Sequence, residues 1–109
     1  MPNDAAQTDS KRPGGRAVVT HELKCWPTFF AAIARGEKRH DLRRATDRDF
    51  HPGDRLFLRE FDPDKKKYTG QSQLVTVTYI TSATMPCALS EQALNPEFCI
   101  LSIAIHSDV

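Results

Sequence analysis

The chain has 109 residues, 39% of them hydrophobic, and its formal net charge is +1 at pH 7. We expect a single domain with a modest hydrophobic core, since this length leaves no room for a second one. The small net charge excludes a strongly basic nucleic-acid-binding protein, so any attraction to an anionic partner would have to be local.

The cysteines and histidines do not follow the spacing of a disulfide framework or a zinc site. Cys25, Cys87 and Cys99 are far apart, and the four histidines are scattered along the chain. We therefore expect reduced thiols, no metal and no cofactor. No apolar run approaches the ~20 residues that span a bilayer, and the N-terminus lacks the apolar segment of a signal peptide. These features predict a cytoplasmic protein without a membrane partner.

Residues 1–16 are polar and contain almost nothing apolar larger than alanine. Such a segment cannot bury enough surface to offset the entropy lost on ordering. We predict a flexible N-terminal tail over residues 1–16 and a folded domain over residues 17–109.

Residues 17–24 alternate as a half-buried strand does, with Val19, His21 and Leu23 on one face. His21 lies among apolar neighbours, which favours a hydrogen-bonded core histidine over a catalytic base. Trp26-Pro27 then indicates the start of a helix, with Pro27 at the first helical position.

The helix is predicted to bury an apolar stripe of Phe29, Phe30 and Ile33, and to end at Gly36. We expect Gly36 to adopt a left-handed conformation that turns the chain into a second strand.

The residues after Gly36 form a polar cluster at the start of that strand. Lys38 offers a mobile point charge, and Arg43 offers a planar fork that suits phosphate or carboxylate, so an anionic ligand is plausible. A strand beginning near Arg39 would place Asp41 and Arg43 on one face. The alternative is a solvated face on which Asp41 pairs with Arg43 or Arg39, which would stabilise little and imply no ligand.

The rest of the chain is rich in strands. Pro52-Gly53 predicts a tight turn before a strand over residues 55–61, and Lys65–Lys67 are expected at the solvated tip of a hairpin with the run 71–81. In that run, the alternation predicts that Val75, Val77 and Tyr79 are on the buried side. Residues 90–94 predict one helical turn, and residues 98–105 predict a last strand with both faces covered.

The ordered series of motifs resembles a known family. His21-Glu22-Leu23-Lys24-Cys25-Trp26-Pro27, the polar cluster, and Phe50-His51-Pro52-Gly53-Asp54 together resemble the ASCH group of PUA-like domains, and within it the small bacterial and phage branch of uncharacterised, DUF3850-like domains. The resemblance covers about residues 21–105. The family motif is a glycine, any residue, lysine, two residues, an acid, one residue and arginine. Gly36, Lys38, Asp41 and Arg43 match its spacing, and Asp41 is shorter than the frequent glutamate.

Periodicity alone indicates an α+β domain rich in strand. The resemblance implies more: a PUA-like small β-barrel of about five strands, one main helix after the first strand and a possible short second helix. It also implies a cleft between the first helix and the barrel, to which the glycine motif contributes its lysine, acid and arginine.

The role that the resemblance implies for this cleft is RNA binding. Lys38 and Arg43 would hold phosphate, Asp41 would orient them or accept from a base amino group, and Lys24 would add positive potential. Trp26 could stack a base. A tryptophan at a helix start is, however, more often a core or capping contact on burial tendencies.

Two other functions remain open. Some members of the ASCH group are amidohydrolases that act on an acylated cytidine nucleoside through a lysine, a threonine and a downstream glutamate. Lys38 matches that lysine, but Asp41 stands where the threonine would be, and the sequence does not select a third catalytic residue among Glu60, Glu91 and Glu97. The third reading is a non-catalytic domain that binds a small anion or a protein partner. The sequence does not indicate the oligomeric state.

Overall fold

The computed structural model describes residues 17–106; the predicted tail over residues 1–16 and the last three residues of the predicted domain lie outside that range. Seven elements follow one another along the chain. They are β1 (Thr20–Cys25), α1 (Pro27–Ala34), β2 (His40–Arg44), β3 (Arg55–Asp62), β4 (Lys67–Ser82), α2 (Ser90–Ala93) and β5 (Phe98–Ile105).

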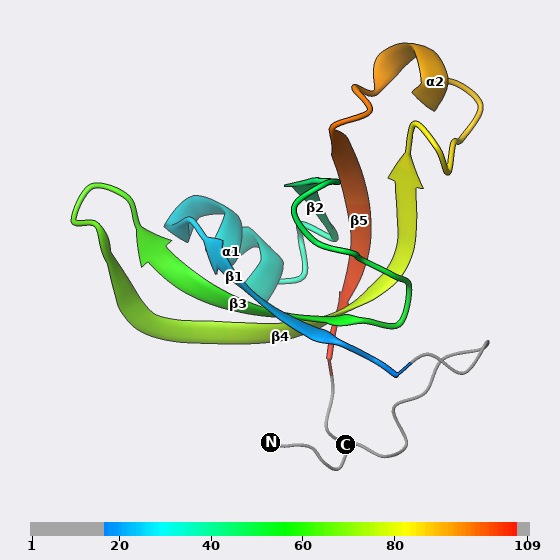
Figure 1. The fold of residues 1–109 in the computed structure, drawn as a ribbon. Coiled ribbons are helices and arrows are strands. Elements are labelled where there is room, and N and C mark those ends of the chain that lie inside the picture. The colour runs from blue at the N-terminus through cyan, green and yellow to red at the C-terminus, as the bar shows by residue number, and fades with distance from the viewer. Residues whose placement is uncertain (1–16, 107–109) are drawn as a thin grey trace.

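The five strands form one sheet in the order β1-β3-β4-β5-β2. β1 and β3 are parallel, and the other neighbouring pairs are antiparallel. Figure 1 shows the sheet curving strongly, so that it forms a half-barrel with α1 on its concave side. The predicted α+β class, the five strands, the main helix after the first strand and the short second helix are confirmed.

The curvature of the sheet depends on β4, which is 16 residues long. Its first part pairs with β3 and its later part with β5, and Figure 1 shows it sweeping from the hairpin to the far end of β5. The register with β5 shifts between Val77 and Tyr79. Because such a bulge adds a residue to one strand, the inward face moves from Tyr79 to Ile80, which is buried, while Tyr79 is 57% exposed. The prediction that Tyr79 faces the core is therefore wrong.

The last strand has the predicted bounds but not two covered faces. Cys99, Leu101 and Ile103 are buried, whereas Ile105 is 46% exposed. β5 lies between β4 and β2, and β2 has only five residues. The short neighbour pairs with β5 only as far as Ser102, so the end of β5 is left open to solvent on that side.

The helix begins as predicted, with Trp26 at the N-cap and Pro27 in the first turn. Phe30 and Ile33 are buried, but Phe29 is 46% exposed. Successive helical residues are rotated by about 100°, so Phe29 and Phe30 cannot both face the sheet. The predicted buried stripe is wrong at Phe29.

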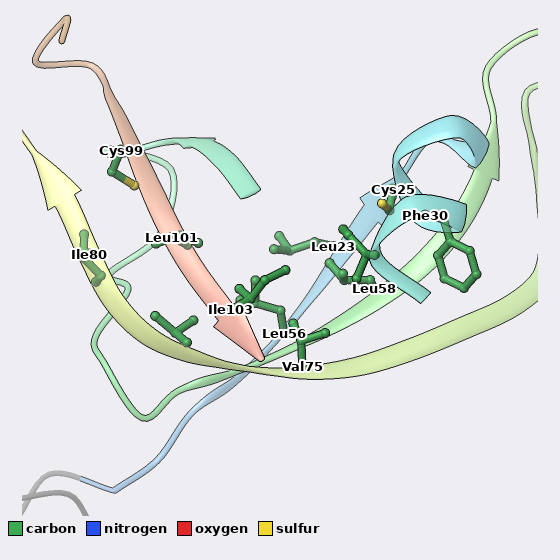
Figure 2. Packing of buried hydrophobic residues seen from close by; sticks show 12 residues of the cluster. Leu23, Cys25, Phe30, Leu56, Leu58, Val75, Ile80, Cys99, Leu101 and Ile103 are labelled. Atoms are coloured by element: carbon green, nitrogen blue, oxygen red, sulfur yellow. The ribbon is translucent and has the colours of Figure 1, made fainter. Parts of the chain in front are cut away.

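The core fills the concave side of the half-barrel (Figure 2). β1 contributes Leu23 and Cys25, α1 contributes Phe30 and Ile33, and the remaining side chains come from β3, β4 and β5. The centres of β3, β4 and β5 are fully buried, as Leu56, Val75 and Leu101 show. This packing holds α1 against the sheet and thereby sets the position of the loop that follows Gly36.

Candidate functional site

The two edge strands of the sheet meet through one arginine. β1 and β2 lie at opposite ends of the strand order. Nevertheless, Nη2 of Arg43 on β2 donates a hydrogen bond of 2.8 Å to the carbonyl oxygen of Lys24 on β1. The curvature of the half-barrel brings them together, and we call this contact between Lys24 and Arg43 the seam. Their sequence separation of 19 residues did not indicate that they meet.

The same guanidinium holds the acid of the glycine motif. Nε of Arg43 donates to Oδ2 of Asp41 at 2.8 Å, and Asp41 is buried. Arg39 instead donates to the carbonyl oxygen of Gly36. The predicted pairing of Asp41 with Arg43 is confirmed, but the pair does not lie on a solvated face, because Asp41 is buried on the inner face of β2.

Lys38 is positioned by the turn at the end of α1. Gly36 has φ of 79°, in the left-handed region that favours glycine, as predicted. The turn directs Nζ of Lys38 to the carbonyl oxygen of His40, at 2.6 Å, and the ammonium lies 5.8 Å from the ring centroid of Phe29. A charged donor is thus held beside an aromatic side chain at the start of β2.

Two exposed aromatic rings lie at the start of α1. Trp26 and Phe29 are stacked, with ring centroids 6.2 Å apart and planes at 11°. Trp26 is 53% exposed, so it is not the core contact that burial tendencies favour. The two rings together form an exposed apolar surface at the start of α1.

These side chains surround one pocket of about 450 Å³, which we call the aromatic pocket. The residues that were predicted as a site and that line it are Lys24, Trp26, Lys38, Asp41 and Arg43. Residues that sequence reasoning missed also line it: Cys25, Phe29, His40 and Leu42. The alternation of His21, Leu23 and Cys25 on β1 was the available signal for Cys25. The structure brings the predicted residues together, and their role in binding stays a prediction.

Cys25 lines the same pocket as the charged side chains of Lys38, Asp41 and Arg43. Burial, and next the charge of Asp41, raise the pKa of the Cys25 thiol to about 11. Arg43 and Lys38 act in the opposite direction. The thiol is therefore neutral at pH 7 and serves as part of the pocket wall, not as a nucleophile.

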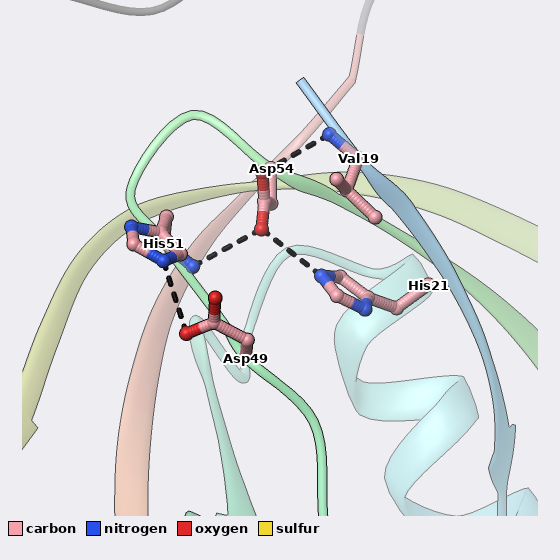
Figure 3. Close-up of polar contacts among 5 residues, drawn as sticks. All are labelled: Val19, His21, Asp49, His51 and Asp54. Carbon is pink, nitrogen blue, oxygen red and sulfur yellow. Dashed lines mark hydrogen bonds and ion pairs between the residues drawn. The ribbon is translucent and has the colours of Figure 1, made fainter. Parts of the chain in front are cut away.

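His21 belongs to a separate, buried network (Figure 3). Its Nε2 lies 3.0 Å from Oδ2 of Asp54, and that carboxylate also accepts from the backbone N–H groups of Val19 and His51. His51 in turn contacts Asp49. His21 and Asp54 are both buried. The expectation of a hydrogen-bonded core histidine is confirmed.

The three downstream acids do not line the aromatic pocket. Glu60 is the register partner of Cys25 and accepts a hydrogen bond from Oγ1 of Thr69 at 2.6 Å. Glu97 lies 3.6 Å from Arg44, and Glu91 is exposed on α2, which Figure 1 shows well away from α1. Of the three acids, Glu60 is the one whose register partner, Cys25, lines the pocket.

Two further observations concern residues 17–106 alone. No three histidine, cysteine or acidic side chains in this range are grouped as metal ligands would be. No helix there is long and apolar enough to cross a membrane.

Comparison with known proteins identifies one family. A family model described as "Domain of unknown function (DUF3850)" matches residues 20–103, which run from the first residue of β1 into β5. No curated protein matches the chain.

Proposed function

The chain belongs to the DUF3850 family, and we propose that its domain binds single-stranded RNA through the aromatic pocket. The observation that carries the proposal is the exposed, stacked pair of Trp26 and Phe29 beside the cations of the same pocket. RNA-binding modules favour unstacked bases lying on aromatic side chains, with cations that follow the phosphates.

We further propose that the half-barrel is a PUA-like domain of the ASCH type. A barrel-like sheet of five strands with its main helix after the first strand supports this assignment. The position of Lys38, Asp41 and Arg43 supports it too, since they line a pocket between α1 and the sheet.

Each side chain of the pocket has a role that follows from its contacts. Trp26 supplies the stacking face. Lys38 and Arg43 bind phosphate, since each has hydrogen-bond donors left over for a ligand. Nη1 of Arg43 makes no hydrogen bond to residues 17–106, and Nζ of Lys38 has two N–H groups besides the one that bonds His40.

Asp41 recognises the base through its carboxylate. Its Oδ2 is held by Arg43, whereas its Oδ1 accepts no hydrogen bond from any of residues 17–106. A carboxylate oxygen accepts from the exocyclic amino group of cytosine or adenine. We therefore expect the pocket to prefer an amino-bearing base over uracil.

The amidohydrolase alternative has weaker support. Nζ of Lys38 is held by the carbonyl oxygen of His40, and Asp41 is held by Arg43. No downstream acid lines the pocket to complete a catalytic set. The enzyme reading is nevertheless retained as an outcome of the test below, as is binding of a small anion or of a protein partner.

The test is binding to random-sequence single-stranded RNA across a salt series. We compare the natural chain with Lys38→Ala, Trp26→Ala and the control Lys65→Ala, which removes an equal charge from the exposed hairpin tip. Loss of one phosphate contact should reduce the slope of log affinity against log salt by about 0.7. Loss of the stacking face should cost about 1–3 kcal/mol, roughly fivefold to 150-fold in affinity, with little change in slope.

The control variant, together with an assay of acylated-cytidine turnover, decides between the proposed functions. Lys65→Ala should bind as the natural chain does. The RNA proposal is wrong if Lys38→Ala and Trp26→Ala also bind unchanged. Turnover of acylated cytidine that disappears in Lys38→Ala would establish the enzyme instead, and nucleoside binding with a shallow salt slope would establish a small-ligand site.

A further inference from the structure

A second pocket lies on the other side of the seam. It has a volume of about 530 Å³ and shares Lys24 and Arg43 with the aromatic pocket. Its further lining includes Arg48 from the loop before β3 and Tyr68 from β4. We call it the basic pocket. Both pockets therefore border on the same two residues.

Three arginines outside the two pockets are paired with acids, whereas Arg39 donates to a backbone carbonyl oxygen instead. Arg35, Arg44 and Arg59 each lie within 3.6 Å of a glutamate. By contrast, Lys24 and Arg48 have no carboxylate within ion-pair distance among residues 17–106, and neither has Lys38. The acids Glu22 and Asp41 are already paired with Arg59 and Arg43, respectively. Asp47 is the one remaining acid of the basic pocket. The unpaired cations favour an anionic ligand that extends over both pockets.

Lys24 is held at the seam by aromatic rings and not by an acid. Its Nζ lies 4.3 Å from the ring centroid of Phe61 and 6.0 Å from that of Tyr68. Ring contacts orient an ammonium without neutralising it, so Lys24 keeps its charge for a ligand. Together with Nη1 of Arg43, it provides two cationic donors at the boundary between the pockets.

Tyr68 provides an aromatic surface in the basic pocket. The guanidinium of Arg59 lies 3.8 Å from its ring centroid, and Phe61 meets it edge to face. These contacts fix the ring, which remains 39% exposed. Each pocket thus contains an exposed aromatic side chain, and the seam between them contains the cations.

We propose that the two pockets form one groove that binds two consecutive nucleotides of single-stranded RNA, with the phosphate that links them at Lys24 and Arg43. This inference rests on the proposed function and adds a minimum ligand length. The first base stacks on Trp26, the second nucleotide occupies the basic pocket beside Tyr68, and Arg48 contacts the next phosphate or sugar. The alternation of aromatic, cationic and aromatic side chains matches the base, phosphate and base of a dinucleotide.

The experiment measures affinity against ligand length with the full chain. The ligands are pools of 5′-phosphorylated mono-, di- and trinucleotides in which each position carries any of the four bases. Titration calorimetry gives the dissociation constants. The natural chain should bind the dinucleotides at least about tenfold more tightly than the mononucleotides. Arg48→Ala should weaken trinucleotide binding about fivefold, more than it weakens mononucleotide binding, and Arg48→Lys should retain most of the affinity.

The controls separate this inference from the function on which it rests. Arg48 makes no side-chain hydrogen bond or ion pair within residues 17–106, so its replacement should not affect folding; Lys65→Ala is the matched exposed-cation control. Lys38→Ala should weaken ligands of every length. Equal affinity for one, two and three nucleotides, or an Arg48→Ala chain that binds trinucleotides normally, would overturn the two-nucleotide groove and leave the aromatic pocket as the RNA site. Absence of binding at every length would overturn both proposals.

Discussion

Asp54 is a carboxylate without exposed surface, and it organises the turn that leads into β3. It accepts hydrogen bonds from the backbone N–H groups of Val19 and His51 and contacts Nε2 of His21. Figure 3 shows these groups converging on it from β1 and from the loop. One buried side chain thus connects the start of β1 to the turn before the strand that pairs with it.

Replacement of Asp54 by alanine should therefore destabilise the domain. Each buried donor left without an acceptor costs about 1–3 kcal/mol, so we expect the free energy of unfolding to fall by about 3 kcal/mol or more. Urea denaturation followed by circular dichroism would measure it. Asp49→Ala is the control, since Asp49 contacts the same loop through His51 but its side chain is 80% exposed. Equal denaturation midpoints for the two variants would contradict a structural role for Asp54.

The three cysteines should differ in the pH at which their thiols are alkylated. Burial raises the pKa of Cys25 to about 11 and also raises that of Cys99, whereas a hydrogen bond from the backbone N–H of Leu89 lowers the pKa of the exposed Cys87. Because only the thiolate is alkylated, iodoacetamide should label Cys87 first as pH rises, below its ordinary pKa of 9.0. Mass spectrometry of the alkylated chain checks the order.

The raised pKa of Cys25 also affects the stability of the fold at high pH. A thiol whose pKa is higher in the folded chain than in the unfolded one stabilises the fold fully below the unfolded pKa, and this contribution is lost as pH rises. For Cys25 the loss should occur between about pH 9 and 11. A Cys25→Ser chain should lack this part of the pH dependence. In the iodoacetamide experiment described above, alkylation of Cys25 before Cys87 in the folded protein would contradict the burial of Cys25.

At the scale of the elements, one side chain joins the two edges of the sheet. Arg43 donates to Asp41 on its own strand and to the backbone of β1, and both ion-pair side chains are largely buried. A hydrogen bond between the edges compensates in part for the ladder that β1 and β2 do not form with each other. The seam is therefore a structural contact as well as the boundary between the two pockets.

Arg43→Ala should lower the free energy of unfolding by about 3 kcal/mol, because it leaves the buried carboxylate of Asp41 without its cation. Arg44→Ala is the matched control on the same strand. Arg44 lies 3.6 Å from Glu97 and both are exposed, so its loss should cost less than about 1 kcal/mol. Arg43→Lys should give an intermediate value, since an ammonium cannot reproduce the fork that reaches both partners. Thermal and urea unfolding measure all three; similar losses for Arg43→Ala and Arg44→Ala would refute the bridging role.

At the scale of the whole molecule, the half-barrel predicts a gradient of protection across the sheet. β4 lies in the middle of the strand order, and β1 and β2 lie at its edges. We expect the amides of Val75 and Val77 to exchange with solvent about tenfold or more slowly than those of the edge strands. Hydrogen exchange followed by NMR measures this difference. Arg43→Ala should speed exchange most in β1 and β2, through local opening of the edges, and in β4 only as far as the free energy of global unfolding falls. Equal protection in β1, β2 and β4 would indicate a closed barrel.

Local patterns predicted most of the elements. Trp26-Pro27 and Gly36 delimited the helix, and Pro52-Gly53 placed the turn before β3, because both signals depend on backbone geometry within a few residues. The errors occur where distant segments decide. Tyr79 faces solvent because the register between β4 and β5 shifts, and no property of residues 71–81 alone reveals that shift.

The sequence by itself determined the kinds of residue at the candidate site and the order of the strands and helices around it. The spacing of Lys38, Asp41 and Arg43 after the glycine was visible in the chain, since it involves one turn and one strand. Only the tertiary structure decided that Arg43 reaches Lys24, that Trp26 and Phe29 stay exposed, and that a second pocket shares the seam. The physical reason is that these relations depend on how far the sheet curves, and the curvature results from the packing of α1 and the bulge in β4 against strands distant in sequence.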